Sequence, residues 1–99
     1  MKLKNRIAIV TGAGSGIGRA TSQLFAAEGA TDIVADVVKE KAGESVSLIE
    51  AAGGTAVSHI VDVTNSGQVE QMITTVLEKY DHIDILVNNA ATSRGNDIL

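Results

Sequence analysis

The stretch T-G-A-G-S-G-I-G, residues Thr11 to Gly18, decides the fold of this chain. It places four glycines between a short apolar run, Arg6–Val10, and an amphipathic run that begins at Gly16. Glycine lets a backbone turn sharply and approach a ligand closely, because no Cβ stands in the way. The two flanking runs predict a buried strand and a helix. The unpartnered N–H groups and the dipole at the start of that helix favour an anion, and a diphosphate is the expected guest.

Beyond this stretch, predicted helices and strands alternate. The later strands are predicted at Ile33–Ala35, ending in Asp36, at Thr55–Val61 and at Ile83–Val87, and the helices at Gly16–Glu28, Lys39–Ala52 and after Asn65. This alternation is typical of βαβ units with a parallel sheet and right-handed crossovers. We therefore expect an α/β partial Rossmann fold: a four-stranded parallel sheet in the order 3-2-1-4 with three helices, two on one face and one on the other.

Apolar stripes predict the buried face of each helix. They comprise Ile17, Ala20, Leu24 and Ala27 in the first helix, Ala42, Val46 and Ile49 in the second, and Val69, Met72, Ile73, Val76, Leu77 and Tyr80 in the third. Gly29 stands where a glycine that ends a helix belongs. Asn65 and Gln68 form a start for the third helix that is similar to a capping box.

Composition excludes several classes of function. Ninety-nine residues allow one small domain, and 44% apolar residues make a core feasible. With two aromatic residues and a net charge of −4, a nucleic-acid partner is not expected. The chain has no cysteine, and His59 and His82 show no metal-ligand spacing. No apolar run approaches the ~18 residues of a membrane helix, so we expect a cytoplasmic protein without a metal or membrane partner.

The spacing of the glycines is G-x-x-x-G-x-G, at Gly12, Gly16 and Gly18. The common dinucleotide fingerprint G-x-G-x-x-G fails, because Ile17 stands where its third glycine would fall. The nucleoside-triphosphate loop fails as well, because no Gly-Lys-Ser/Thr follows. A tight strand-to-helix turn without a ligand is the alternative interpretation.

Asp36 is the second candidate residue. It lies at the predicted carboxyl end of the second strand, 18 residues beyond Gly18. A carboxylate there can accept both hydroxyl hydrogens of an adenosine ribose, and it would repel a 2′-phosphate. Val37 follows it and Ser15 sits in the glycine turn, so we expect no nearby arginine or lysine that could bind a phosphate. We expect NAD rather than NADP, with a solvated strand-end aspartate as the alternative.

Polar residues also end the third and fourth predicted strands, as Asp62-Val63-Thr64 and Asn88-Asn89-Ala90-Ala91. Both segments fall at the carboxyl edge, where an open α/β sheet binds its ligand. Alternatively, Asp62 only forms a turn and Asn89 only makes strand-end hydrogen bonds.

Together these pieces resemble the short-chain dehydrogenase/reductase family over essentially the whole chain. The resemblance rests on Thr11-Gly-x-x-x-Gly16-Ile-Gly18, Asp36, Asp62-Val63 and Asn88-Asn89-Ala90, in this order. It implies an NAD-dependent oxidoreductase of secondary alcohols or ketones. The cofactor-binding residues that it implies are Gly12, Ser15, Gly16, Ile17, Gly18, Asp36, Asp62, Val63, Asn89 and Ala90.

The resemblance also assigns roles to these residues. The backbone around Ser15–Ile17 would contact the pyrophosphate, and Asp36 would hold the ribose on the adenine side. Asp62 would reach the adenine amino group, with the Val63 amide beside it. Asn89 and Ala90 would line the path towards the nicotinamide ribose. Thr11 and Asn89 would tie strands together.

The sequence departs from the family pattern at three places. Ala91 replaces a usual glycine, and Asp32 replaces a usual apolar strand residue, which predicts a later start or awkward pairing of the second strand. The family's catalytic serine and Tyr-x-x-x-Lys pair would come well beyond the fourth strand. Asp84 stands four residues after Tyr80, and Ser93 and Asn96 come too early for the family's serine and asparagine.

We therefore expect residues 1–99 to be the N-terminal part of an NAD(P)-binding Rossmann domain, truncated before the catalytic region and without catalytic residues of its own. An alcohol or ketone would be a partner only of a full-length form. The alternatives are a non-catalytic NAD-binding or interaction module and a non-functional product. An exposed fourth strand and a sheet face covered by a single helix predict self-association through the sheet edge.

Overall fold

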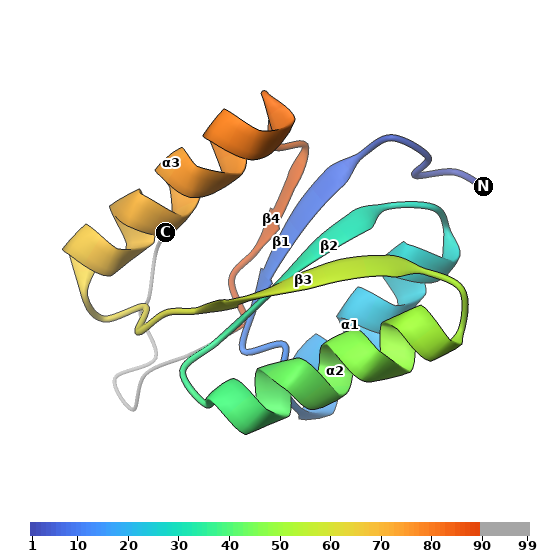
Figure 1. Cartoon of the computed structure of the whole chain (residues 1–99), viewed down its shortest axis with the longest axis horizontal. Coiled ribbons are helices and arrows are strands. Elements are labelled where there is room, and N and C mark those ends of the chain that lie inside the picture. The colour runs from blue at the N-terminus through green and yellow to red at the C-terminus, as the bar shows by residue number, and fades with distance from the viewer. Residues whose placement is uncertain (90–99) are drawn as a thin grey trace.

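The structure, a computed structural model, describes residues 1–89. Ala90, a predicted cofactor contact, lies outside them, as do Ala91, Ser93 and Asn96. The elements in chain order are β1 (Ile7–Thr11), α1 (Gly16–Ala27), β2 (Thr31–Asp36), α2 (Lys39–Ala51), β3 (Thr55–Ile60), α3 (Ser66–Tyr80) and β4 (Ile85–Val87) (Figure 1).

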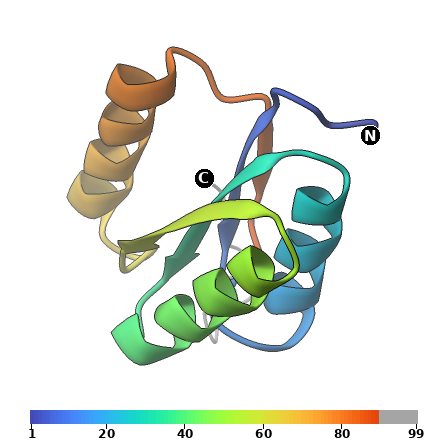
Figure 2. The ribbon, with the colours of Figure 1, turned by 45° about the vertical axis from the view of Figure 1, so that its right-hand side comes forward.

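All strand pairs are parallel, and the order across the sheet is β3-β2-β1-β4. Figure 2 shows α1 and α2 on one face of the sheet and α3 on the other. The predicted fold, a four-stranded partial Rossmann sheet with three helices, is therefore confirmed. The first strand is central, and the carboxyl ends of β1, β2 and β4 meet at one edge, where α1 begins (Figure 1).

Alternation along the strands divides the core in two, because successive side chains point to opposite faces. The core on the α3 face contains Ile7, Ile9, Ile33, Ala35, Val61, Met72 and Val76. The core under α1 and α2 contains Val10, Ala13, Ala26, Val34, Ala42, Ile49 and Ala56. The second core consists mainly of alanine and valine, so the two helices lie close to the sheet.

The predicted strand boundaries were wrong at β2 and β4. β2 begins at Thr31 rather than Ile33, and Asp32 pairs in register with Ala8 and Ala56. β4 begins at Ile85 rather than Ile83. The cause lies at Asp84, where only half of the backbone ladder forms. The N–H of Asp84 donates to the carbonyl oxygen of Ile7 at 2.9 Å, but the N–H of Ile7 donates to the Asp84 side-chain Oδ2 at 2.8 Å.

The predicted buried face of α1 was also wrong. Gly18, Ser22 and Ala26 are buried, whereas Ile17 and Leu24 are 77% and 63% exposed. The small residues face the sheet because α1 must pack within backbone distance of β1. The stripes of α2 and α3 are confirmed except at Leu77, which is 42% exposed.

Side chains of α3 organise the turn before it. The side chain of Asn65 accepts from the N–H of Gln68 at 3.1 Å, as a cap should. The Gln68 side chain accepts instead from the N–H of Asp62, at 2.8 Å, and so fixes the loop that follows β3. The capping box is therefore half formed, and its second half supports the carboxyl end of β3.

The α3 core yields the first testable prediction. Met72 is fully buried, so Met72→Ala should lower the free energy of unfolding by about 2–5 kcal/mol through lost burial and a cavity. Leu77→Ala, on the same helix but half-exposed, is the matched control and should cost about 1 kcal/mol or less. Urea unfolding followed by circular dichroism measures both. Equal costs for the two variants would contradict the packing described for α3.

Candidate functional site

The glycine turn leaves the start of α1 open. Gly12 and Gly16 have φ of 65° and 57°, in the left-handed region that favours glycine. Ser15 caps the helix in an extended conformation, its side chain makes no capping hydrogen bond, and no acidic residue stands in the first turn. Ser15, Gly16 and Ile17 are exposed. The positive end of the helix dipole therefore faces solvent at this edge of the sheet.

Gly18 allows the helix to approach the strand. A Cβ at this position would lie 2.2 Å from the carbonyl oxygen of Gly12 and 2.7 Å from Nδ2 of Asn89. Real Cβ atoms do not make such contacts, so only glycine fits without a shift of the backbone. The third glycine of the motif thus serves packing between α1, β1 and the end of β4.

Asp36 lies beside the turn, as its position at the end of β2 predicts. Its Oδ2 accepts from the N–H of Gly14 at 2.8 Å, and its Oδ1 accepts from the N–H of Val38 at 2.9 Å. A Cβ on Gly14 would lie 2.7 Å from Oδ2. The carboxylate is half-buried and held rigidly, and each oxygen keeps a second lone pair for a hydroxyl donor.

Arg19 is a residue of this region that the sequence reasoning missed. Its guanidinium donates to the carbonyl oxygen of Gly14, to Oγ of Ser45 at 2.8 Å and to Glu44 at 3.1 Å. Ser45 in turn donates to the carbonyl oxygen of Ala13 at 2.6 Å. This network joins the glycine turn to α1 and α2. A serine within the apolar stripe of α2, between Ala42 and Ile49, was the available signal, because a buried hydroxyl needs a partner.

The expected lack of lysine or arginine near Asp36 needs correction. A Cβ added to Gly14 would lie 2.8 Å from the Cβ of Lys41 and 2.7 Å from Oδ2 of Asp36, so Lys41 lies close to the Asp36 carboxylate. The first turn of α2 brings Lys41 there although it is five residues from Asp36 in sequence. Sequence neighbours alone did not reveal it.

Thr11 joins the ends of β1 and β4. Its hydroxyl donates to Oδ1 of Asn88 at 3.2 Å and accepts from the N–H of Asn89 at 3.0 Å. Nδ2 of Asn89 donates to the carbonyl oxygen of Gly12 at 3.4 Å. The tie between strands that the resemblance implied for Thr11 and Asn89 is confirmed, and it places Asn89 against the glycine turn.

Asp62 and Val63 lie after β3, two strands away from β1. Oδ1 of Asp62 accepts from the hydroxyl and the N–H of Thr64 at 2.6 and 2.9 Å, and these bonds hold the pKa of that carboxyl below its usual range. Val63 packs against the α3 core. Asp62 therefore forms a turn at the same edge of the sheet as Asp36.

The site thus combines an open helix N-terminus, a fixed carboxylate and polar strand ends. Among residues 1–89, no group of three His, Cys, Asp or Glu residues could hold a metal ion. Within the same range, no helix is long and apolar enough to cross a membrane.

Tyr80 is the last residue of α3 and lies at the opposite edge of the sheet from this site. Its ring packs against the α3 core, and the Lys79 ammonium lies over the ring, 5.2 Å from its centre. It takes no part in this site.

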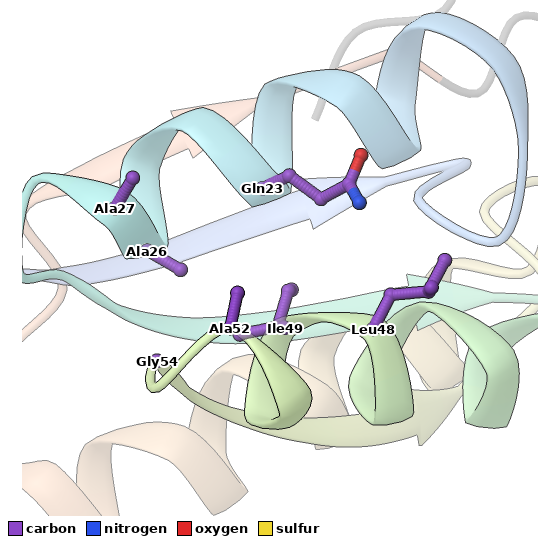
Figure 3. A pocket seen from close by; sticks show the side chains of 7 residues that line it. All are labelled: Gln23, Ala26, Ala27, Leu48, Ile49, Ala52 and Gly54. Carbon is purple, nitrogen blue, oxygen red and sulfur yellow. The ribbon is translucent and has the colours of Figure 1, made fainter.

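A small hollow lies between α1 and α2, on the face of the sheet opposite α3. It has a volume of about 80 Å³, and side chains of α1 and α2 point towards each other across it (Figure 3). Its lining residues are Gln23, Ala26, Ala27, Leu48, Ile49, Ala52 and Gly54. Ligand pockets commonly enclose roughly 300–1,000 Å³, so this gap is a packing feature rather than a second binding site.

A parallel sheet in this order, with a glycine turn and an acidic residue at the end of β2, defines a nucleotide-binding α/β protein of the Rossmann type. The comparisons with known proteins give the family. The model of the short chain dehydrogenase family matches residues 6–99. The chain belongs to this family, whose members bind a nucleotide cofactor.

Its relatives include a 3-oxoacyl-(acyl-carrier-protein) reductase of Thermotoga maritima, 42% identical over 94 residues, which are 95% of this chain and 38% of that protein. A short-chain dehydrogenase/reductase homolog of Bacillus subtilis, YusS, is 40% identical over 95% of this chain and 87% of its own length. A metagenomic short-chain oxidoreductase in complex with NADP has a similar structure, with a TM-score of 0.90, 36% identity and coverage of 93% of this chain and 42% of that chain. The chain thus spans less than half of most such relatives and nearly all of one.

Gly18 generates the second prediction. Gly18→Ala should lower the free energy of unfolding by about 1–3 kcal/mol, the usual cost of forcing atoms into a packed region. Gly43→Ala is the matched control, because Gly43 is an exposed residue in α2 with nothing within 4 Å of an added Cβ. It should raise the free energy of unfolding by about 0.5–1 kcal/mol through helix propensity. Thermal and urea unfolding give both values; a neutral Gly18→Ala would refute the close contact.

Proposed function

We propose that residues 1–99 form the N-terminal part of an NAD(P)-binding Rossmann domain and that they bind NAD. The observation that carries the proposal is the Asp36 carboxylate, which two backbone N–H groups hold beside the glycine turn. A rigid acceptor pair next to an open helix N-terminus suits a ribose linked to a diphosphate.

The proposed contacts follow the edge of the sheet. The backbone at Gly12 and Ser15–Gly18 would bind the pyrophosphate through N–H groups and the helix dipole. Asp36 would accept from the two hydroxyls of the adenosine ribose. Asp62 and the Val63 amide would lie beside the adenine, and Asn89 with Ala90 would line the route to the nicotinamide ribose.

The preference for NAD over NADP rests on charge. A 2′-phosphate at the ribose would stand against the Asp36 carboxylate and be repelled. Among residues 1–89, the guanidinium that lies at the glycine turn is that of Arg19, and it is already bonded to Gly14, Ser45 and Glu44. The exposed Lys41 is the cation that could compensate, so the balance between Asp36 and Lys41 sets the discrimination. The structural relative in complex with NADP belongs to the same family.

For a longer protein that contains this part, we propose oxidation of a secondary alcohol or reduction of a ketone. The bound nicotinamide supplies or receives the hydride. Residues of this chain would bind and orient the cofactor: the glycine turn anchors one end, and Asn89 with Thr11 keeps the route at the other end rigid. Acid–base groups for the substrate oxygen would come from residues beyond position 99, and the protein would act in the cytoplasm.

A second candidate function is a small module that binds NAD without catalysis. The Bacillus subtilis homolog YusS favours it, since this chain covers 87% of that protein. β4 lies at the edge of the sheet, and Leu86, its middle residue, is 41% exposed. We propose that copies of such a module associate through this edge, which dilution in analytical ultracentrifugation would reverse.

Asp36 provides the third prediction. Asp36→Ala should weaken NAD binding by about 1.5–3 kcal/mol, the range for hydrogen bonds to a charged group. NADP binding should weaken less or improve, because the repulsion of the 2′-phosphate disappears. Isothermal titration calorimetry of both nucleotides with the 99-residue chain measures the two affinities.

The ratio of the two affinities separates ligand contact from damage to the turn. Loss of the Gly14 and Val38 hydrogen bonds alone would weaken both nucleotides equally. Glu44→Ala is the control, since it removes a nearby exposed carboxylate that bonds only Arg19 among the described residues, and it should leave the ratio unchanged. No binding of either nucleotide by the unmodified chain at millimolar concentration would refute both candidate functions.

A further inference from the structure

Asp32 is a carboxyl group inside the sheet without a partner. It lies in β2 between Ala8 of β1 and Ala56 of β3, and none of its surface is exposed. Neither carboxylate oxygen has a hydrogen-bond partner among the described residues. The two strands that flank it offer only methyl groups at this level. A carboxyl group is therefore enclosed by apolar neighbours where the family pattern has an apolar residue.

The side chain points beneath α1 and α2. Val34, two residues further along β2, belongs to the core on that face, as does Ala56, the register partner of Asp32. Ser22 of α1 is fully buried too, and its hydroxyl likewise has no partner among residues 1–89. The gap between α1 and α2 is lined by Ala26 and Ile49 of the same core (Figure 3). The layer above Asp32 thus contains a second unpartnered polar group, the Ser22 hydroxyl, in a core that borders a small gap.

No charged group on the surrounding elements compensates Asp32. The charged or titratable residues of these elements are Arg19 on α1, Lys39, Glu40, Lys41, Glu44 and Glu50 on α2, His59 on β3 and Asp36 on β2. Arg19 is bonded at the glycine turn, and those of α2 are all exposed. His59 follows Val57 by two residues and so shares its face, that of α3. Asp36 is bonded to Gly14 and Val38.

We propose that Asp32 is a proton-operated switch: α1 and α2 pack fully on the sheet only while its carboxyl group is neutral. An ionised carboxylate in this place would lack both water and a counter-ion, which is the most costly form of burial. Ionisation is relieved only when the helix layer separates from the sheet and admits water. The fold consequently takes up a proton as it forms.

The direction of the pH effect follows from the pKa. Burial raises the pKa of Asp32 from 3.8 to about 7. Because the folded chain holds the proton more tightly than the unfolded chain, stability is greatest below the unfolded value and falls as the pH rises towards about 7. The equilibrium constant for unfolding should rise up to about tenfold per pH unit in this window. His59, whose pKa burial lowers, acts in the opposite direction.

The same proton would regulate the nucleotide site, a consequence that rests on the proposed function. α1 carries Ser22 and Ala26 over the Asp32 face, and it begins at the glycine turn. Separation of α1 from the sheet would therefore disturb the turn. NAD affinity should fall as the pH rises through neutrality, and bound NAD should make the loss of the proton harder.

The test compares the pH profiles of unfolding of the 99-residue chain, Asp32→Asn and Asp32→Val between about pH 4 and pH 8. Asn keeps the shape but cannot ionise, and Val restores an apolar residue. As the pH rises, the midpoint of unfolding should fall for the unmodified chain more than it does for either variant. Exposed Asp81→Asn is the matched control and should follow the unmodified chain, and His59 acts equally in all four.

The proposal would be overturned if the stability of the unmodified chain and that of Asp32→Asn changed with pH in the same way. It would also be overturned if both chains were unfolded at every pH. Infrared spectroscopy gives a direct second readout. A protonated carboxyl C=O stretch should be present in the folded unmodified chain at mildly acidic pH and absent from Asp32→Asn; its absence from both would contradict the switch. A failure to bind NAD at any pH would refute the proposed function but leave these stability profiles as an independent result.

Discussion

The contact between Gly18 and the carbonyl oxygen of Gly12 is the constraint on which the rest of the structure depends. It brings the start of α1 within backbone distance of β1, and a single Cβ would break it. Asn89 reaches the same carbonyl from β4, so one oxygen joins a strand, a helix and the neighbouring strand end. The face of α1 towards the sheet must then be built from small residues, which moves Ile17 and Leu24 to the outside.

The consequences for the site are electrostatic. Because the backbone provides the contacts at Gly12 and Gly18, the N–H groups at the helix start remain directed to solvent. Asp36 takes one N–H of the turn, that of Gly14, and is thereby fixed at the mouth of the site. Arg19 binds the carbonyl of the same residue. The turn is thus held from both sides while its anion-binding end stays open.

The pattern of strands and helices was sufficient to predict the sheet order and the faces of the helices, because alternation and crossover handedness allow few arrangements. The same pattern also predicted that Asp36, Asn89 and the glycine turn lie at one edge of the sheet. The buried face of α1 was not predictable from hydrophobicity, because backbone proximity selected glycine, serine and alanine over leucine and isoleucine. Arg19 and Lys41 escaped notice since their positions depend on how α1 and α2 pack. Asp32 predicted a later start or awkward pairing of β2. In the structure the strand includes Asp32, because β1 and β3 pair with it on both sides.

The central claim is that one edge of this sheet binds a dinucleotide. The most direct measurement is the change in backbone amide resonances of the ¹⁵N-labelled 99-residue chain on addition of NAD. The account predicts changes concentrated at residues 12–18, 36–38, 62–63 and 88–89, with little effect at Ile7, Asp84 and the α1–α2 gap, which lie away from this edge. Changes centred on that gap or on the opposite edge, or an unaltered spectrum at millimolar NAD, would contradict it.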